Sequence, residues 1–249
     1  MHDIAGCRII CRTVDEVYAV RRRLQKSRSK HKHISGGKYD YLTFPKEDGY
    51  RGIHDVYAYC VKGTSGEQYN GLRVEIQYRT HHQHAWATAL EISDLIEGTR
   101  VKFDSGKNPD KERFFLLASE YIARKFEGMT GYLADIRLED IVGEMAMLEA
   151  RNGYISRLKK AHTSRAQVPN SKNIVLHFSN DGLALHGASS MKKALDLLSV
   201  LEASNPEDEI VYVRAEKPAE VKSVFRNYFS NAGSFLRMMP EEIKKLSSS

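Results

Sequence analysis

The sequence has few cysteines and no long apolar run. Its three cysteines, Cys7, Cys11 and Cys60, are too few and too irregularly spaced for a disulfide framework or a four-cysteine zinc site, so we expect small core residues in a reducing compartment. The longest apolar runs, such as residues 174–176, are far below the ~20 residues that span a bilayer. The first residues also lack a basic segment followed by an apolar one, so we expect no signal peptide and a cytoplasmic location.

The composition is that of a globular protein, and its positive charge is unevenly distributed. Of 249 residues, 41% are hydrophobic and 28% charged, which predicts one large or two small domains rather than a disordered chain. The net charge of +6 arises within residues 1–65, and the segment 21–33 holds seven Lys or Arg without an acid. Such a field attracts nucleotides, RNA or acidic lipid, although a solvated helix face that continues into a loop would have the same composition.

The first hundred residues alternate between strand and helix patterns. The apolar segment 8–11 predicts a buried strand, and a helix over 14–26 follows, with Thr13 as N-cap and Glu16 completing a capping box. The polar segment 27–38 predicts a loop. Two β-rich segments, 53–61 and 72–78, predict an antiparallel hairpin, and a helix is expected from about Thr80.

The remainder predicts a helical segment and then a smaller α/β unit. A loop at 101–109 leads to helical stretches at 110–127 and 136–163, and a polar segment with Pro169 resembles a linker. The predicted C-terminal elements are strands 173–178, 183–186 and 209–214 and helices 189–203 and 218–227. We therefore expect α+β organisation in three parts, 1–105, 106–168 and 169–249.

Two carboxylates lie on or beside predicted core strands. Asp3 directly precedes the first strand, and Glu75 lies inside the second strand of the hairpin. An ionised carboxylate between apolar neighbours is costly unless it is paired, binds a cation or points to solvent. Phosphoryl-transfer enzymes use one or two such groups to hold Mg²⁺ against phosphate oxygens.

The segment Pro45–His54 combines side chains that suit an anionic aromatic ligand. Gly49 and Gly52 permit close backbone approach, Lys46 and Arg51 offer positive charge, and Tyr50 offers a flat ring for a base. By composition alone, a turn with scattered polar residues explains the segment better.

Three ordered motifs resemble one known family. Asp3–Ile9 (DIAGCRI), Asp40–His54 (DYLTFPKEDGYRGIH) and Val74–Thr80 (VEIQYRT), followed by His84–Ala87 (HAWA), resemble the RelA/SpoT family of alarmone synthetases over residues 3 to about 97. The resemblance implies a nucleotidyltransferase-like mixed sheet flanked by helices. It also implies transfer of the β,γ-pyrophosphate of ATP to the 3′-oxygen of GDP or GTP, making (p)ppGpp and releasing AMP.

The resemblance also assigns roles to individual residues. It implies that Asp3 and Glu75 bind Mg²⁺, with Glu75 as a base toward the 3′-hydroxyl. It implies that Tyr50 stacks on guanine and that Lys46 contacts phosphates. Further residues would line the same pocket, among them Arg51, His54, Gln77 and Arg79.

The sequence departs from the family pattern at several positions. Asp48 and Gly52 stand where the family usually has Asn and Ser, and Tyr39 stands where it has Lys. The family's ATP-gripping helix precedes the first strand, so we expect little alarmone synthesis from residues 1–249 alone. A relative that pyrophosphorylates the 3′ end of tRNA and an inactive nucleotide-binding module stay open as alternatives, as does a homo-oligomer.

Two histidine patterns invite other interpretations. His81 and His84 share a predicted helix face, but no acid or cysteine at a suitable spacing completes a zinc site. His54-Asp55 resembles the His-Asp pair of alarmone hydrolases, but those ligands are carried on helices and this pair begins a strand.

Overall fold

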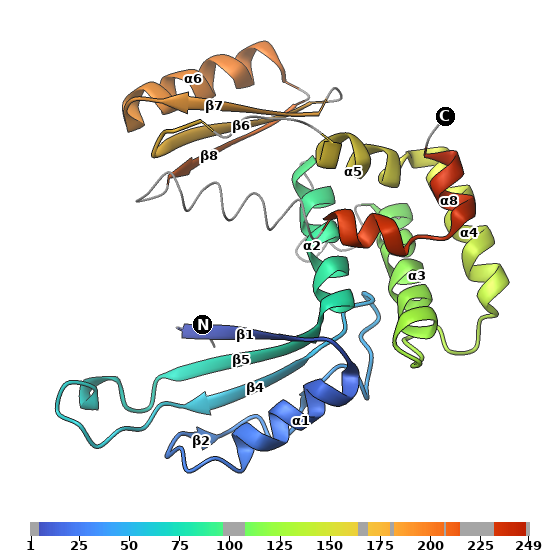
Figure 1. Ribbon diagram of the computed structural model, residues 1–249. Coiled ribbons are helices and arrows are strands. Elements are labelled where there is room, and N and C mark those ends of the chain that lie inside the picture. The colour runs from blue at the N-terminus through green and yellow to red at the C-terminus, as the bar shows by residue number, and fades with distance from the viewer. Residues whose placement is uncertain are drawn as a thin grey trace. The chain divides into compact units, whose positions relative to one another are not determined.

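The computed structural model describes residues 5–96, 108–163, 169–179, 182–206, 208–214 and 232–247 (Figure 1). The chain divides into two compact units, one of residues 1–84 with 116–138 and the other of residues 85–115 with 139–249. Helices α2 (His81–Ile96) and α3 (Pro109–Phe126) contribute residues to both units. The predicted limits of the three parts fall beside or within the undescribed segments 97–107 and 164–168, so that division stays a prediction.

The first unit is built on a mixed sheet. Its strands are β1 (Ala5–Cys11), β2 (Lys32–His33), β3 (Tyr39–Asp40), β4 (Ile53–Ala58) and β5 (Arg73–Thr80). The order is β1-β5-β4-β2, with β3 also paired to β4. Strand β1 runs parallel to β5, whereas β4 is antiparallel to β5, β2 and β3. The predicted hairpin is therefore confirmed, and its connection includes a short 3₁₀ helix, Glu67–Tyr69.

Helix α1 (Val14–Gln25) packs on one face of this sheet (Figure 1). Thr13 caps it as predicted, because its hydroxyl accepts a hydrogen bond from the Glu16 amide at 3.2 Å. The Glu16 carboxylate bonds the Arg12 amide at 2.9 Å rather than that of Thr13, which shifts the capping box by one residue. Val17, fully buried, lies at the centre of a core formed with Cys11, Leu42, Ile53 and Tyr78.

An ionic network also lies on the α1 side of the sheet. The guanidinium of Arg21 bonds the fully buried Asp55 at 2.8 Å and Asp40 at 3.0 Å, and Gln25 and His33 also contact Asp55. Arg21 therefore does not belong to a solvated helix face, the alternative that the composition of the basic segment leaves open. The cations that follow it are exposed, namely Arg22, Arg23, Lys26, Arg28, Lys30 and Lys32.

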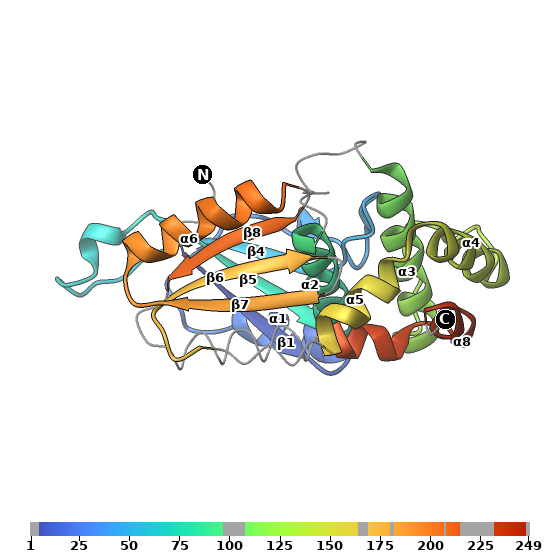
Figure 2. The ribbon, with the colours of Figure 1, turned by 90° about the horizontal axis from the view of Figure 1, so that it is seen from above.

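The second unit combines helices with a three-stranded antiparallel sheet. Its elements include α4 (Leu138–Asn152), α5 (Tyr154–Thr163), β6 (Asn173–Ser179), β7 (Gly182–Ala188), α6 (Met191–Ser204), β8 (Glu209–Arg214) and α8 (Glu241–Leu246). The strand order is β7-β6-β8, and α6 covers one face with Ala194 packed against Val175 and Ile210 (Figure 2).

The predicted α+β class, with a mixed sheet flanked by helices, is confirmed, and three details were wrong. The loop at 27–38 includes β2, and the stretch 136–163 is two helices because Gly153 adopts a φ of 67° between α4 and α5. Of the cysteines, only Cys11 is buried, while Cys7 and Cys60 are exposed. The predicted helix 218–227 lies outside the described residues. In the described part of the chain, no helix has the length and apolarity needed to cross a membrane.

Candidate functional site

The candidate site lies on the sheet face opposite α1. Side chains alternate between the two faces of a strand, so Glu75, Gln77 and Arg79 of β5 point away from the face that carries Ile76 and Tyr78. The register places His54 of β4 opposite Gln77, and Arg8 of β1 opposite Gln77 on the other side. Polar residues from three neighbouring strands therefore meet on this face.

Glu75 is the carboxylate at the centre of this face. Its Oε1 accepts a hydrogen bond from Gln77 Nε2 at 2.5 Å and lies 3.1 Å from His54 Nδ1. Its side chain is 17% exposed, and no Lys or Arg among the described residues forms an ion pair with it. Glu75 is thus contacted by Gln77 and His54, and no described Lys or Arg lies at ion-pair distance from it.

Tyr50 and His54 form one connected pair beside Glu75. The Tyr50 hydroxyl lies 2.5 Å from His54 Nε2 and 3.1 Å from Arg79 Nε. Burial is the largest influence on the pKa of His54 and lowers it; Glu75 opposes this, and the positive charges of Arg79, Lys46 and Arg8 lower the pKa further. Burial also raises the pKa of Tyr50, so both side chains are neutral near pH 7.

Two cations lie against the Tyr50 ring. Arg79 is 3% exposed and stacks over the Tyr50 ring at 4.9 Å, yet none of the described carboxylates pairs with it and its Nη1 lacks a hydrogen-bond partner. A buried guanidinium without a counter-ion is costly, which suits a site for an external anion. Lys46 is more exposed and bonds Asp48 at 2.8 Å. Partial burial lowers the pKa of Lys46, but the hydrogen bond and charge of Asp48, together with Tyr41 and Tyr50, raise it by more.

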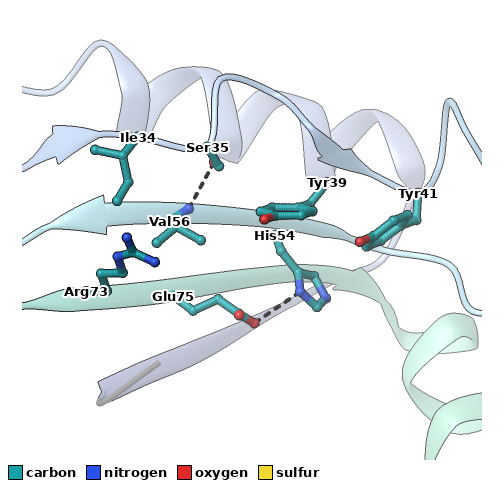
Figure 3. Close-up of a pocket in the computed structure, with 8 residues that line it drawn as sticks. All are labelled: Ile34, Ser35, Tyr39, Tyr41, His54, Val56, Arg73 and Glu75. Atoms are coloured by element: carbon teal, nitrogen blue, oxygen red, sulfur yellow. Dashed lines mark hydrogen bonds and ion pairs between the residues drawn. The ribbon is translucent and has the colours of Figure 1, made fainter. Parts of the chain in front are cut away.

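A cavity of about 260 Å³ opens beside Glu75 (Figure 3). Figure 3 shows the rings of Tyr39, Tyr41 and His54 at one end and Arg73 at the other. The lining residues are Ile34, Ser35, Tyr39, Tyr41, His54, Val56, Arg73 and Glu75. Aromatic rings, a cation and a carboxylate around one opening suit a nucleotide-sized anion.

Arg51 is the one described candidate that does not join this face. It is 3% exposed and forms an ion pair with Glu127, which also accepts hydrogen bonds from Thr80 Oγ1 and Gln83 Nε2. The Arg51 guanidinium is therefore committed to a buried network within the first unit.

The structure brings together most residues that the resemblance singled out. The described ones on the open face are Lys46, Tyr50, His54, Glu75, Gln77 and Arg79. Asp3 lies outside the described residues. Tyr50, expected to stack on guanine, is 7% exposed and meets Tyr41 and His54 edge to face, so its ring is covered in this structure.

Sequence reasoning did not select Arg8, Tyr39, Tyr41 or Arg73. Arg8 donates to Gln77 Oε1 at 3.1 Å, and the other three line the cavity. The sequence could have indicated Arg73, because it lies two residues before Glu75 on the same strand and side chains two residues apart point to the same face of a sheet. For Tyr39 and Tyr41 no such signal existed, because β3 is only two residues long.

The donor set fits a magnesium ion in part. Glu75 offers a hard carboxylate oxygen on a rigid strand, which Mg²⁺ favours. Within the described ranges, no three His, Cys, Asp or Glu side chains gather as a metal-binding group, and this includes His81 and His84. The second carboxylate that the sequence suggests is Asp3.

Comparisons with known proteins show what this region is similar to. Residues 1–94 match the family described as "Region found in RelA / SpoT proteins". The chain is 34% identical to the GTP pyrophosphokinase YjbM of Bacillus subtilis over 138 residues, covering 55% of this chain and 60% of that protein. It is 36% identical to the GTP pyrophosphokinase YwaC of the same organism over 89 residues, covering 35% of this chain and 40% of that protein.

A solved structure is also similar to part of the chain. It is the crystal structure of small alarmone synthetase 1 from Bacillus subtilis bound to its product pppGpp. The match has 35% identity and a TM-score of 0.41, and covers 50% of this chain and 58% of that one. The chain thus spans between two fifths and three fifths of the length of these three relatives.

Proposed function

Because residues 1–94 carry a RelA/SpoT region, we propose that this protein transfers pyrophosphate from ATP to the 3′-hydroxyl of GDP or GTP. The relatives named GTP pyrophosphokinase support the reaction class. The observation that carries the proposal is that one sheet face holds a carboxylate, Glu75, and a buried cation, Arg79, neither of which forms an ion pair with an oppositely charged Lys, Arg, Asp or Glu among the described residues.

In the proposed reaction, the carboxylate and the cations have different roles. Glu75 accepts the proton of the 3′-hydroxyl while the 3′-oxygen forms a bond to the β-phosphorus of ATP. The bond between the β-phosphorus and the oxygen that bridges it to the α-phosphorus breaks, and AMP leaves. Arg79 and Lys46 stabilise the negative charge on the phosphates, since a low-dielectric site strengthens such contacts.

Glu75 and Asp3 are the residues that would hold Mg²⁺. When bound, the ion would neutralise charge that develops on the transferred phosphates. Tyr50 retains its predicted role on the guanine ring, which requires that a ring face become accessible.

One experiment tests the reaction. Purified protein is incubated with ATP labelled in its β,γ-phosphates, Mg²⁺ and either GDP or GTP, and products are separated by chromatography. In keeping with the low synthesis expected from residues 1–249 alone, we expect slow transfer of label to the guanosine nucleotide by the parent. We expect at least a ~100-fold slower transfer with Glu75→Gln, because losing this carboxylate removes several kcal/mol of transition-state stabilisation. The matched control Glu67→Gln makes the same change in the 3₁₀ helix. No transfer and no guanine-nucleotide binding by the parent would reject the proposal, whereas binding without transfer would indicate an inactive binding module.

A tRNA acceptor is the second candidate, and the exposed cations at positions 22–32 favour it. A basic surface of this kind binds polyphosphate chains with a steep salt dependence. Deacylated tRNA belongs in the same assay. Label on tRNA but not on GDP or GTP would select this alternative.

A further inference from the structure

Helix α3 carries a buried serine whose hydroxyl bonds outside its own helix. Ser119 is 6% exposed, and its Oγ donates a hydrogen bond to the backbone carbonyl of Gly49 at 2.5 Å. We propose that Ser119 is a positioning residue that holds residues 46–52, the binding segment, in the conformation that takes up the guanosine nucleotide. This inference rests on the proposed function and adds to it a residue that acts through Gly49.

The packing around Ser119 does not need a hydroxyl. The neighbouring residues of α3 are buried and apolar, namely Leu117, Ala118, Ile122 and Ala123. An alanine at position 119 would have a higher helix propensity and would bury no polar atom. A serine inside a helix often bonds a carbonyl one turn back, but the Ser119 hydroxyl instead reaches Gly49, 70 positions away in the same unit.

Gly49 is the residue at which the binding segment turns. Its φ of 82° lies in the left-handed region that favours glycine, and its amide donates to the Lys46 carbonyl at 3.0 Å. The next amide, that of Tyr50, donates to Asp48 Oδ1 at 2.8 Å. The Gly49 carbonyl and the Tyr50 amide belong to one planar peptide group. The bond from Ser119 therefore fixes the peptide plane from which the Tyr50 side chain departs.

The binding segment carries two side chains that the proposed function assigns to the nucleotide. The Tyr50 ring lies 4.9 Å from the Arg79 guanidinium and 5.9 Å from Lys46 Nζ. Without the Ser119 hydroxyl, the buried Gly49 carbonyl loses its partner, which favours conformations in which it meets water. A nucleotide that binds only the ordered conformation then binds more weakly, in proportion to the population of that conformation.

Ser119→Ala tests this inference by titration with GDP, without any need for turnover. We expect the Kd for GDP to rise about 5- to 50-fold, the range that follows from leaving one buried acceptor unpaired. Ser119→Thr keeps a hydroxyl and should bind GDP within about threefold of the parent. The matched control is Ser156→Ala, which removes a hydroxyl that donates to Glu149 Oε1 at 2.9 Å in the second unit and should leave the Kd unchanged.

A double-mutant cycle separates positioning from a general loss of stability. If Ser119 acts through Tyr50, then Ser119→Ala should raise the Kd of a Tyr50→Ala variant by less than about threefold, whereas independent effects would multiply. Effects that multiply would overturn the inference, as would a Ser119→Ala variant that binds GDP as tightly as a parent that does bind it. A parent that binds no GDP would instead reject the proposed function, and this inference with it.

Discussion

Replacing Glu127 by glutamine tests whether Arg51 stabilises the fold or binds a nucleotide. The side chains of Arg51 and Glu127 are each 2% exposed, so neither charge is solvated. The Glu127→Gln side chain would stay within hydrogen-bonding reach of Thr80 and Gln83 but leave the guanidinium without a counter-charge. Breaking a buried ion pair from one side costs about 3–5 kcal/mol.

This cost is measurable by urea unfolding. At a slope of about 2 kcal/mol per molar urea, the midpoint should fall by roughly 1.5–2.5 M. Amide hydrogen exchange in β4 and β5 reports the same loss within the first unit, since these strands lie in its sheet. The exposed Glu241→Gln, by contrast, should leave the midpoint unchanged.

A double-mutant cycle completes the argument. Arg51→Met with Glu127→Gln removes both charges, so the double variant should be more stable than the sum of the single losses predicts. Strictly additive losses would refute a direct pair. A variant Arg51→Met that keeps the parental midpoint yet loses guanine-nucleotide affinity would show that Arg51 binds ligand instead.

Three further predictions concern the open face and its border. Asp48→Asn keeps an acceptor for the Tyr50 amide but removes the ion-pair partner of Lys46, so we expect titration to show about 2- to 10-fold tighter GDP binding. The control Glu47→Gln makes the same charge change at the neighbouring position and should have a smaller effect. Tyr50→Ala should weaken guanine-nucleotide binding by about 1–3 kcal/mol if the ring stacks on the base, and equal affinity of variant and parent would mean that the ring is structural. Burial, and then the charge of His81, lower the pKa of His82 in the folded protein. As the pH falls below about 6.5, His82 is therefore protonated in the unfolded chain before it is protonated in the folded protein. The free energy of unfolding should therefore drop below that pH, and the drop should be smaller in His82→Gln, as measured by urea midpoints between about pH 7.5 and 5.

Local patterns sufficed for most of the first unit. Alternation around Glu75 predicted its strand, and the spacing of Val14, Val17 and Leu24 predicted α1 to within one residue of its observed end. These features depend on neighbours within a few positions. The two-residue strand β2 exists only through pairing with β4, so no local pattern could indicate it.

Long-range partners explain what the sequence could not supply. Arg51 looked like a phosphate ligand because its partner Glu127 lies 76 positions away and no spacing rule joins them. Arg21 looked like one more exposed cation, yet its partner Asp55 lies 34 positions away on β4. In both cases, the fold brings a carboxylate that is distant in sequence to the cation and neutralises its charge.

The two faces of the sheet differ in how their carboxylates are paired, and this difference supports the proposed site. Asp55, on the α1 face, is fully buried and receives Arg21, His33 and Gln25, so its charge is balanced within the protein. Glu75, only one strand away, is contacted by neutral His54 and Gln77, while Arg79 remains without an ion-pair partner in the described ranges. On the α1 face the carboxylate charge is paired within the protein, whereas on the other face charges of both signs lack ion-pair partners among the described residues. Such unpaired charges are electrostatically costly, and an external ligand can offset that cost. The ligand that offsets it most fully carries anionic groups for Arg79 and Lys46 and a hydroxyl for Glu75, which is the chemistry of a nucleotide acceptor.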